Sequence, residues 1–475
     1  MKRVLIIALA PLALAGCANF SPDAGMGAVA NRVRADERRD VVMVATDEED
    51  ENAAGRARAL LRRGLNVERA VQVAFLRNKG LQAAYNDLGL SEAQFVAASL
   101  PPNPTVSLLS LRGAMSYDIE RRLVADLLAL ATLPARRDIA ETSWRKAQLE
   151  AIASTLRLAA DVRRQYWKAA GARAQTKYLL QARANAETTA ELAHKLGETG
   201  ALNKLDQGRE FAFYAELAAQ VAKARTQEKI EKERLTRLMG LWGQDIDYAL
   251  PQSLPGLPPA PRAFAALETQ ALDRRVDVAM ARADLEKTAK ELGLTQATRF
   301  VNAFELGAAE TWTKSVSTDS SGTQSTDRAH VRGVEASFQI PIFDLGQART
   351  REAEETYMRA ANRLAEKGVN ARSEVREAYT AYRGAYDVAR LYQSKVLPLR
   401  KTIEDESMLR YNGMIADLFI LLQDARARVL SNVAAIEARR DFFVADADLH
   451  AAIVGGGMSG AEPRPSALAA AATTD

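Results

Sequence analysis

The fold is decided by the stretch VRGVEASFQIPIFDLG, residues 331–346, and by the helical pattern that follows it. Apolar and polar side chains alternate in its first part, and this period of two predicts a strand with one apolar face. The apolar members are Val334, Ala336, Phe338 and Ile340. After the break at 341–346, apolar residues recur at spacings of three and four, which predicts a helix packed lengthwise against other helices. These residues are Val375, Ala378, Tyr382, Ala385, Ala389, Tyr392, Val396, Leu399 and Ile403. A helix over residues 347–411 would be roughly 100 Å long, more than an ordinary globular domain needs.

The composition favours helical arrays and excludes a nucleic-acid partner. Only 6% of the 475 residues are aromatic and 26% are charged, which suits long helices better than a sandwich or a doubly wound sheet. The net charge is +4, with acidic and basic residues interleaved. Nucleic-acid binding would require a basic stripe with aromatic residues among it, and no such stripe is present in the sequence.

The amino terminus predicts a lipidated, exported protein. Lys2 and Arg3 precede an apolar run at 4–15 that is too short to span a bilayer and has the character of a signal peptide, residues 1–16. The run ends in LAGC, which resembles the lipobox of bacterial lipoproteins, and Cys17 is the one cysteine in the chain. The resemblance implies that Cys17 carries diacylglycerol and becomes the first mature residue. Ala18 follows where aspartate would resemble an inner-membrane retention signal, so delivery to the outer membrane is implied.

Three further segments lie outside the repeated part of the chain. Residues 17–63 form a lipidated arm, expected to be extended, with a solvated acidic run at 47–51. Residues 241–262 form a stiff proline-rich linker, and the tail 456–475 is expected to be disordered.

The remaining residues form two internal repeats, 64–240 and 263–455. Each consists of a helix, a β-hairpin, a long helix and a further helix. The expected helices of the first repeat are 66–99, 134–197 and 203–239, around strands 105–111 and 119–130. The second repeat has helices 264–295 and 347–411, a last helix to 454, and strands 300–309 and 331–342 joined by a polar loop at 315–327.

The hairpins predict a membrane protein whose sheet is shared between chains. No segment after residue 17 is apolar enough for a transmembrane helix, whereas the second hairpin has the apolar–polar alternation of a membrane strand. Four strands per chain cannot close a spanning barrel, because bare edges are not tolerated in lipid. Two chains would supply eight strands with a filled interior, and three would supply twelve with room for a pore.

Several motifs resemble the TolC-type outer-membrane efflux proteins, in particular the lipidated members. They lie between Asn66 and Gly455: IPIFDLG at 340–346, VLP at 396–398, YNG at 411–413, and LDRRVDV at 272–278, where Val276 replaces the usual proline. The resemblance implies a homotrimer with a twelve-stranded β-barrel and a helical tunnel, serving as exit duct for an inner-membrane pump joined through a periplasmic adaptor. The first hairpin departs most from the family pattern, with Arg121, Arg122 and Asp126 amid weak alternation.

No catalytic or cofactor motif is present. There is no phosphate-binding glycine loop and no nucleophile elbow, so the chain is not expected to be an enzyme or to hold a cofactor. His194, His330 and His450 are far apart in sequence, and no metal site is expected. The alternative to a duct is a periplasmic coiled-coil structural lipoprotein without a pore, which the alternating strand from Val331 disfavours.

The resemblance places a periplasmic gate at the turns farthest from the barrel, at Gly200 and Gly413. Many relatives carry acidic residues just after the second glycine, whereas the aligned positions here hold Phe419 and Leu422. Ordinary packing against a neighbouring helix explains that apolar stripe best. We therefore expect the polar side to hold the mouth shut. The candidates are Arg410 and Tyr411 on one side of the turn and Asp417 and Asp424 on the other.

Overall fold

The computed structural model describes residues 20–457, except 319, 341, 414, 416 and 417. Cys17, Asp417, the signal peptide and most of the predicted tail lie outside the described residues. The chain divides into two units. The first contains the β-sheet with its adjoining helix segments, Asn86–Leu149 and Ala279–Lys367, and the second contains the other helical segments, Met26–Tyr85, Glu150–Val278 and the chain from Gly368.

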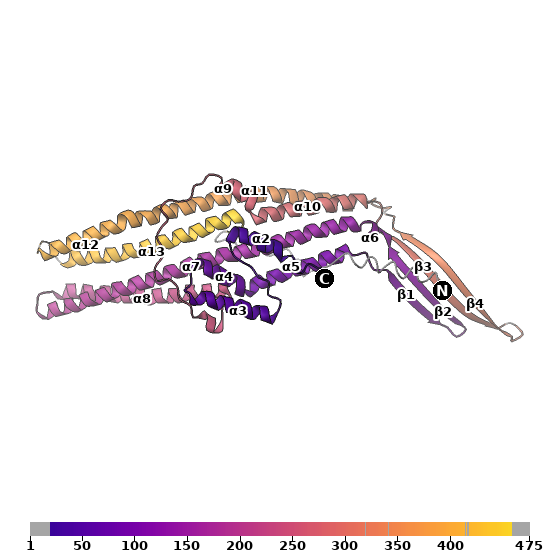
Figure 1. The fold of residues 1–475 in the computed structure, drawn as a ribbon, viewed down its shortest axis with the longest axis horizontal. Helices are drawn as coiled ribbons and strands as arrows, with labels where there is room; N and C mark the ends of the chain where they lie inside the picture. The colour runs from indigo at the N-terminus through magenta and orange to yellow at the C-terminus, as the bar shows by residue number, and fades with distance from the viewer. Residues whose placement is uncertain (1–19, 319, 341, 414, 416–417, 458–475) are drawn as a thin grey trace. The chain divides into compact units, whose positions relative to one another are not determined.

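The sheet of the first unit has four antiparallel strands in the order β1-β2-β3-β4 (Figure 1). The strands are β1 (Thr105–Arg112), β2 (Ser116–Asp126), β3 (Phe304–Thr318) and β4 (Gln324–Phe338). Leu123 pairs with Ala308, which pairs with Val334, so the two hairpins join through β2 and β3 without a shift in register. β1 and β4 are the edge strands. Almost every sheet residue is exposed or half-buried in the single chain, so the sheet has no core of its own.

The strand limits differ from the prediction. β3 and β4 extend into the polar segment 315–327, which was expected to be a loop and is now reduced to the residues between Thr318 and Gln324. The serine and threonine content of this segment predicts a loop, but threonine also fits an exposed, pleated strand well. β2 ends at Asp126 instead of Leu130, because the Asp126 carboxylate accepts a hydrogen bond from the Ala129 amide (2.8 Å) and starts helix α6 (Leu127–Ala131).

The helix segments of the first unit are joined by polar contacts. They come from α5 (Lys79–Ser99), α7 (Leu133–Glu198), α10 (Val276–Ala297) and α11 (Gln347–Leu391). Lys290 of α10 donates to the Thr142 hydroxyl of α7 at 2.8 Å, and Lys146 pairs with Asp284 at 2.9 Å. The ring of Phe95 stacks on Trp144 with centroids 5.4 Å apart, which fixes α5 against α7.

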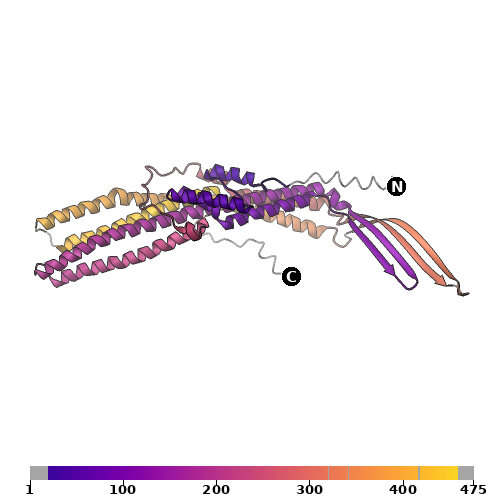
Figure 2. The same cartoon turned by 60° about the horizontal axis from the view of Figure 1, so that its bottom comes forward.

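The second unit contains two helical hairpins, which Figure 2 shows from a second direction. One hairpin consists of the end of α7 and α8 (Lys204–Met239), and the other of α12 (Leu397–Asn412) and α13 (Leu418–Val454). α7 is 66 residues long, so it reaches the length of roughly 100 Å predicted for a long helix. Its core with α8 is built from Leu179, Ala182, Ala186, Leu217, Val221 and Ala224.

The second long helix is interrupted by a π-helical turn, Tyr392–Val396. The amide of Leu397 donates to the carbonyl of Tyr392, and Pro398 follows at the start of α12. Proline cannot donate to the preceding turn and clashes with its carbonyl, and a π-turn accommodates both defects. The extra residue rotates the apolar stripe. Leu399 and Ile403, predicted on the seam, are 60% and 40% exposed in the single chain, whereas Val375 and Tyr382 before the turn are buried.

The expected extended arm is largely helical. α2 (Met26–Glu37) and α3 (Asp47–Arg62) lie within it, and α3 packs against α4 (Val67–Arg77). The acidic run forms the first turn of α3, where carboxylates are favoured by the exposed amides of a helix start. The Thr46 hydroxyl accepts from the Glu49 amide, and the Glu49 carboxylate accepts from the Thr46 amide, which is a capping box.

Each repeat opens with a pair of helices where the sequence predicted one. In the first repeat α4 and α5 meet at Asn78, whose side chain accepts a hydrogen bond from the Leu81 amide and starts α5. In the second, α9 (Leu267–Arg274) and α10 meet at Arg275, whose backbone is extended. Arg275 is buried, pairs with Asp277 and Glu374, and donates to the Ala452 carbonyl. At the second break, the Arg275 side chain therefore contacts other segments of the second unit.

An aromatic core holds the proline-rich linker in the second unit. Tyr382, Tyr386 and Phe442 are fully buried and in ring contact. The Tyr386 hydroxyl donates to the carbonyls of Pro258 and Pro259, at 3.1 Å each. Among the described residues, no helix is both long and apolar enough to cross a bilayer.

Candidate functional site at the helix turns

Two turns connect the helices of the two hairpins, and they differ in backbone geometry. Gly200 follows α7 with φ +74°, a conformation that favours glycine, and the amides of Ala201 and Leu202 close the helix on the Leu196 carbonyl. Gly413 follows α12 with φ −83°, and its amide donates to the Leu409 carbonyl at 3.0 Å. The first turn therefore requires glycine for its conformation, whereas the second does not.

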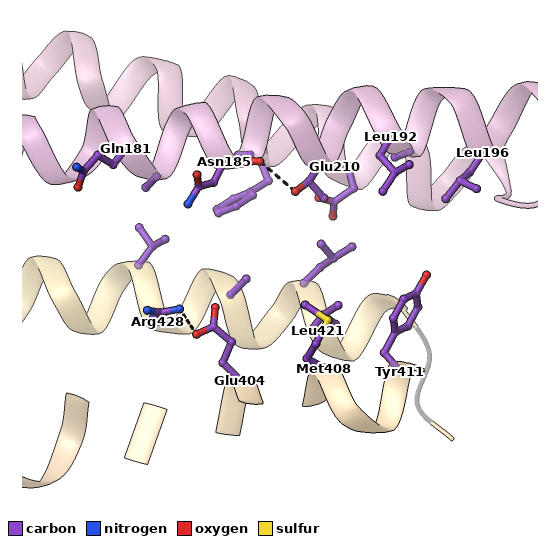
Figure 3. Close-up of a pocket in the computed structure, with 18 of the residues that line it drawn as sticks. Gln181, Asn185, Leu192, Leu196, Glu210, Glu404, Met408, Tyr411, Leu421 and Arg428 are labelled. Atoms are coloured by element: carbon purple, nitrogen blue, oxygen red, sulfur yellow. Dashed lines mark hydrogen bonds and ion pairs between the residues drawn. The ribbon is translucent and has the colours of Figure 1, made fainter. Parts of the chain in front are cut away.

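A cavity of about 610 Å³ lies beside these turns, between the two hairpins of the second unit (Figure 3). One wall comes from α7 and α8 and the other from α12 and α13. Its apolar lining includes Leu192, Leu196, Met408, Leu421 and Leu422. Glu210, Glu404 and Arg428 add charge, so the cavity is a partly polar gap in the packing of the hairpins.

Arg426 of α13 connects the two hairpins. Its Nη2 donates to the backbone carbonyl of Arg209 on α8 at 2.7 Å. Its guanidinium lies over the Phe213 ring, 4.6 Å from the centroid, and 4.0 Å from the Glu210 carboxylate. In a second contact the cation comes from α8 and the ring from α13: the Arg209 guanidinium lies 4.7 Å from the ring centroid of Phe419. We call these contacts the Arg426 clasp.

Glu210 is a buried carboxyl at the edge of the cavity, with 2% of its surface exposed. Burial raises its pKa above the ordinary value, Arg426 opposes the shift, and the nearby charge of Asp206 adds to it. Ionising the buried Glu210 carboxyl therefore costs more free energy in the closed arrangement than in water, so this contact weakens as the pH rises through the raised pKa.

Two polar pairs lie inside the α12–α13 hairpin. Arg428 of α13 forms an ion pair with Glu404 of α12, marked in Figure 3. The Ser407 hydroxyl of α12 donates to the Asp424 carboxylate of α13. These two pairs fix α13 on α12.

The predicted gate residues lie around the same turn but do not form one polar cluster in the single chain. Tyr411 and Leu422 line the cavity, and Phe419 contacts Arg209 of α8. Asp424 binds Ser407 of its own hairpin. Arg410 is exposed, and its carbonyl accepts from the Ile415 amide at 2.9 Å. Asp417 lies outside the described residues.

The clasp residues were missed by sequence reasoning. Arg426 and Arg209 lie in different repeats, so no local spacing connects them. The one available signal was the apolar surrounding of Glu210, which is followed by Phe211, Phe213 and Tyr214 and therefore stands near an aromatic run.

The described residues contain no cluster of histidine, cysteine and carboxylate side chains that could hold a metal ion. His194 lies 3.4 Å from Glu198, and His450 lies 3.2 Å from Glu37, so both rings have carboxylate partners.

Comparison with known proteins identifies the family. Residues 267–452 match the family model described as outer membrane efflux protein. This part of the chain is similar to the outer membrane efflux proteins. The match covers the second repeat from α9 to α13, including the LDRRVDV segment and the second turn. This match agrees with the family that the sequence motifs resemble.

The fold is that of solved outer-membrane proteins. A membrane protein from Pseudomonas aeruginosa has a TM-score of 0.67 and 20% identity, covering 82% of this chain and 93% of that one. The VceC outer membrane protein of Vibrio cholerae has a TM-score of 0.66 and 16% identity, covering 82% and 96%. The open state of the Neisseria gonorrhoeae MtrE outer membrane channel has a TM-score of 0.66 and 17% identity, covering 82% and 89%. No curated protein sequence matches the chain.

These similarities confirm the predicted fold class, long helices combined with a small antiparallel sheet. Members of the outer membrane efflux protein family are transport ducts and not enzymes, in agreement with the sequence. Homologous channels are trimers that work with periplasmic adaptors and inner-membrane pumps, which agrees with the predicted partners.

Proposed function

We propose that three copies of this chain form a lipid-anchored exit duct whose periplasmic mouth is held shut by the Arg426 clasp. The observation that carries the assembly is the four-stranded sheet with two open edges, β1 and β4. Exposed edges present unpaired backbone groups, which lipid does not tolerate. A closed sheet shared by three chains satisfies both edges of every copy.

The duct receives its substrate from an inner-membrane pump through a periplasmic adaptor. We divide its chain into a signal peptide (1–16), an arm (17–63), a first repeat (64–240), a linker (241–262), a second repeat (263–455) and a tail (456–475). This division follows the repeated order of elements, since a helix pair, a hairpin, a long helix and a final helix occur twice.

The lipid anchor is Cys17. It lies shortly before Ser21, whose amide and hydroxyl donate to the Glu92 carboxylate of α5. That contact attaches the chain to the first unit four residues after the proposed acylated cysteine. One lipidated end anchors weakly by itself, and the membrane-embedded sheet supplies the second attachment.

The mouth lies at the Gly200 and Gly413 turns. The clasp ties α13 to α8, and Arg410, Tyr411 and Asp417 add polar contacts between neighbouring chains at the same level. Each contact is individually weak, about 0.2–1 kcal/mol for an exposed charge pair, and threefold repetition multiplies it. Such a mouth stays closed at rest and yields to an adaptor.

The test is single-channel recording of the purified full-length protein in planar bilayers. The parent should insert and conduct poorly, and substituting both Arg410 and Asp417 with alanine should raise the conductance and admit large antibiotics into cells. A protein that never conducts, in any variant, would be a structural lipoprotein without a pore. If Phe419→Ala opens the pore while the double variant and Arg209→Ala do not, the constriction is apolar.

A further inference from the structure

The register of the sheet separates its side chains into two faces of opposite charge. Residues paired directly across antiparallel strands point to the same side, so one face follows from the pairs Leu123–Ala308–Val334 and Arg121–Glu310–Arg332. We call it the basic face. The opposite, acidic face contains the row Val124–Gly307–Glu335.

The charges are almost fully sorted between these faces. The basic face carries five cations and one carboxylate, namely Arg112, Arg121, Lys314, Arg328, Arg332 and Glu310. The acidic face carries six carboxylates and one cation, namely Asp118, Glu120, Asp126, Glu305, Asp327, Glu335 and Arg122. Arg122 forms an ion pair with Glu335 on its own face.

The basic face is ordered along the strands. Its helix-proximal rows are apolar, with Phe304 opposite Phe338, Leu306 opposite Ala336, and Leu123, Ala308 and Val334 in one row. The row of Arg121, Glu310 and Arg332 follows, about 20 Å along the strand from Phe304. Beyond it, Trp312 stacks on His330, and the last cations lie nearest the hairpin turns. An apolar band bordered by aromatic and basic residues is typical of a surface that faces lipid.

A shallow hollow of about 410 Å³ lies at the border between the apolar and the basic rows. Its apolar lining includes Val106, Leu123 and Ala308. Its charged lining is Arg121, Glu310 and Arg332 from the basic face, together with Arg122. The Arg332 side chain is 75% exposed although it contacts Glu310 at 3.1 Å. Arg121 makes no ion pair with any residue that the structure describes. The hollow thus offers two guanidinium groups, with the Glu310 carboxylate between them, beside an apolar surface.

We propose that the basic face binds the phosphate groups of an anionic membrane lipid, with Arg121 and Arg332 as the central contacts. Guanidinium groups bind phosphate oxygens in pairs of hydrogen bonds, and the adjoining apolar rows accept the acyl chains. Charge complementarity favours this occupant, since the face is basic where lipid headgroups begin. The proposal rests on the proposed placement of the sheet in the outer membrane.

The experiment is native mass spectrometry of the full-length protein in detergent, titrated with bis-phosphorylated lipid A. Each basic side chain near a membrane surface contributes roughly a fivefold factor in affinity, so R121Q/R332Q should weaken binding about 25-fold. The control is Arg58→Gln, which removes an exposed cation from α3, outside the sheet, and should leave lipid binding within about twofold of the parent. R121K/R332K keeps the charge and should bind better than the glutamine variant.

Equal lipid binding by the parent and R121Q/R332Q overturns the proposal, as does an equal loss in R58Q. Displacement of lipid A by equimolar inorganic phosphate also overturns it, because the site would then be one for the free anion. Elution as a trimer on gel filtration establishes that each variant is assembled. Failure of the proposed duct is a separate result: no variant would conduct in bilayers, whereas failure of the lipid site leaves conductance intact.

Discussion

Replacing Arg426 with alanine should open the periplasmic mouth of the duct. The substitution removes the 2.7 Å hydrogen bond to the Arg209 carbonyl, the cation–π contact with Phe213 and the cation that faces Glu210. A charged hydrogen bond is worth about 1.5–3 kcal/mol and an exposed cation–π contact about 0.5–1 kcal/mol. Because the Arg426 side chain is 35% exposed, solvent screening favours the low end.

The expected loss is therefore about 2 kcal/mol per chain, which is the sum of the two lower limits. At about 1.4 kcal/mol per factor of ten, the ratio of separated to closed hairpins rises roughly 30-fold. The measurement is single-channel conductance, with the growth of cells on an antibiotic too large for other pores as a second readout. The open-state conductance should become frequent in R426A.

Arg428→Ala is the matched control. Arg428 lies one helical half-turn from Arg426, but its partner Glu404 belongs to the same hairpin. Its removal should loosen α12 against α13 without releasing α13 from α8, so the conductance should stay near that of the parent. If R428A opens the duct and R426A does not, the clasp is not the closing contact.

Three further outcomes follow from the same contacts. Mass spectrometry should find acylated Cys17 at the mature amino terminus, and Cys17→Ala should reduce anchoring without abolishing membrane insertion; an unmodified terminus at another residue would contradict this. Burial raises the pKa of Glu210 above 4.5, so its stabilisation of the closed hairpins is complete below that pH and is lost as pH rises through the raised value. Conductance should therefore increase with pH across that window, and Glu210→Gln should abolish the dependence; a pH profile unchanged by the substitution would refute the role. Arg275→Ala breaks a buried ion network with Glu374 and should lower the free energy of unfolding by about 3–5 kcal/mol. The control Arg376→Ala breaks an exposed ion pair and should cost at most about 1 kcal/mol. Thermal unfolding in detergent measures both.

The long helices and the strand alternation could be predicted because each depends on local periodicity. The stripe through Val375 and Tyr382 marked a buried helix face, and both residues are buried. The same stripe wrongly predicted buried positions after Pro398, because the π-turn at 392–396 rotates the helix. A missing backbone donor changes helical phase in a way that spacing alone does not reveal.

The arm and the hairpin ends were misjudged for a different reason. The acidic run at 47–51 suggested a solvated segment, although Thr46 and Glu49 already form a capping box in the sequence. The Ser/Thr-rich segment around residue 320 suggested a loop, although ladder hydrogen bonds stabilise exposed strands whatever their polarity.

The candidate site could be located from the turns but not assembled. Gly200 and Gly413 correctly marked where the long helices end. The clasp joins Arg426 to Arg209 and Phe213 across the two repeats, and such long-range contacts depend on how hairpins pack. Sequence spacing reports neighbours on one helix and not across helices.

The most direct test of the account is the mass of the detergent-solubilised complex, measured by light scattering with correction for bound detergent. The proposed duct contains three copies of the chain, because a sheet with two open edges is not stable in lipid alone and twelve strands leave room for a pore. A mass of three lipidated chains, in a preparation that conducts in planar bilayers, is the predicted result. A monomer that keeps an intact sheet in mild detergent would contradict the shared duct.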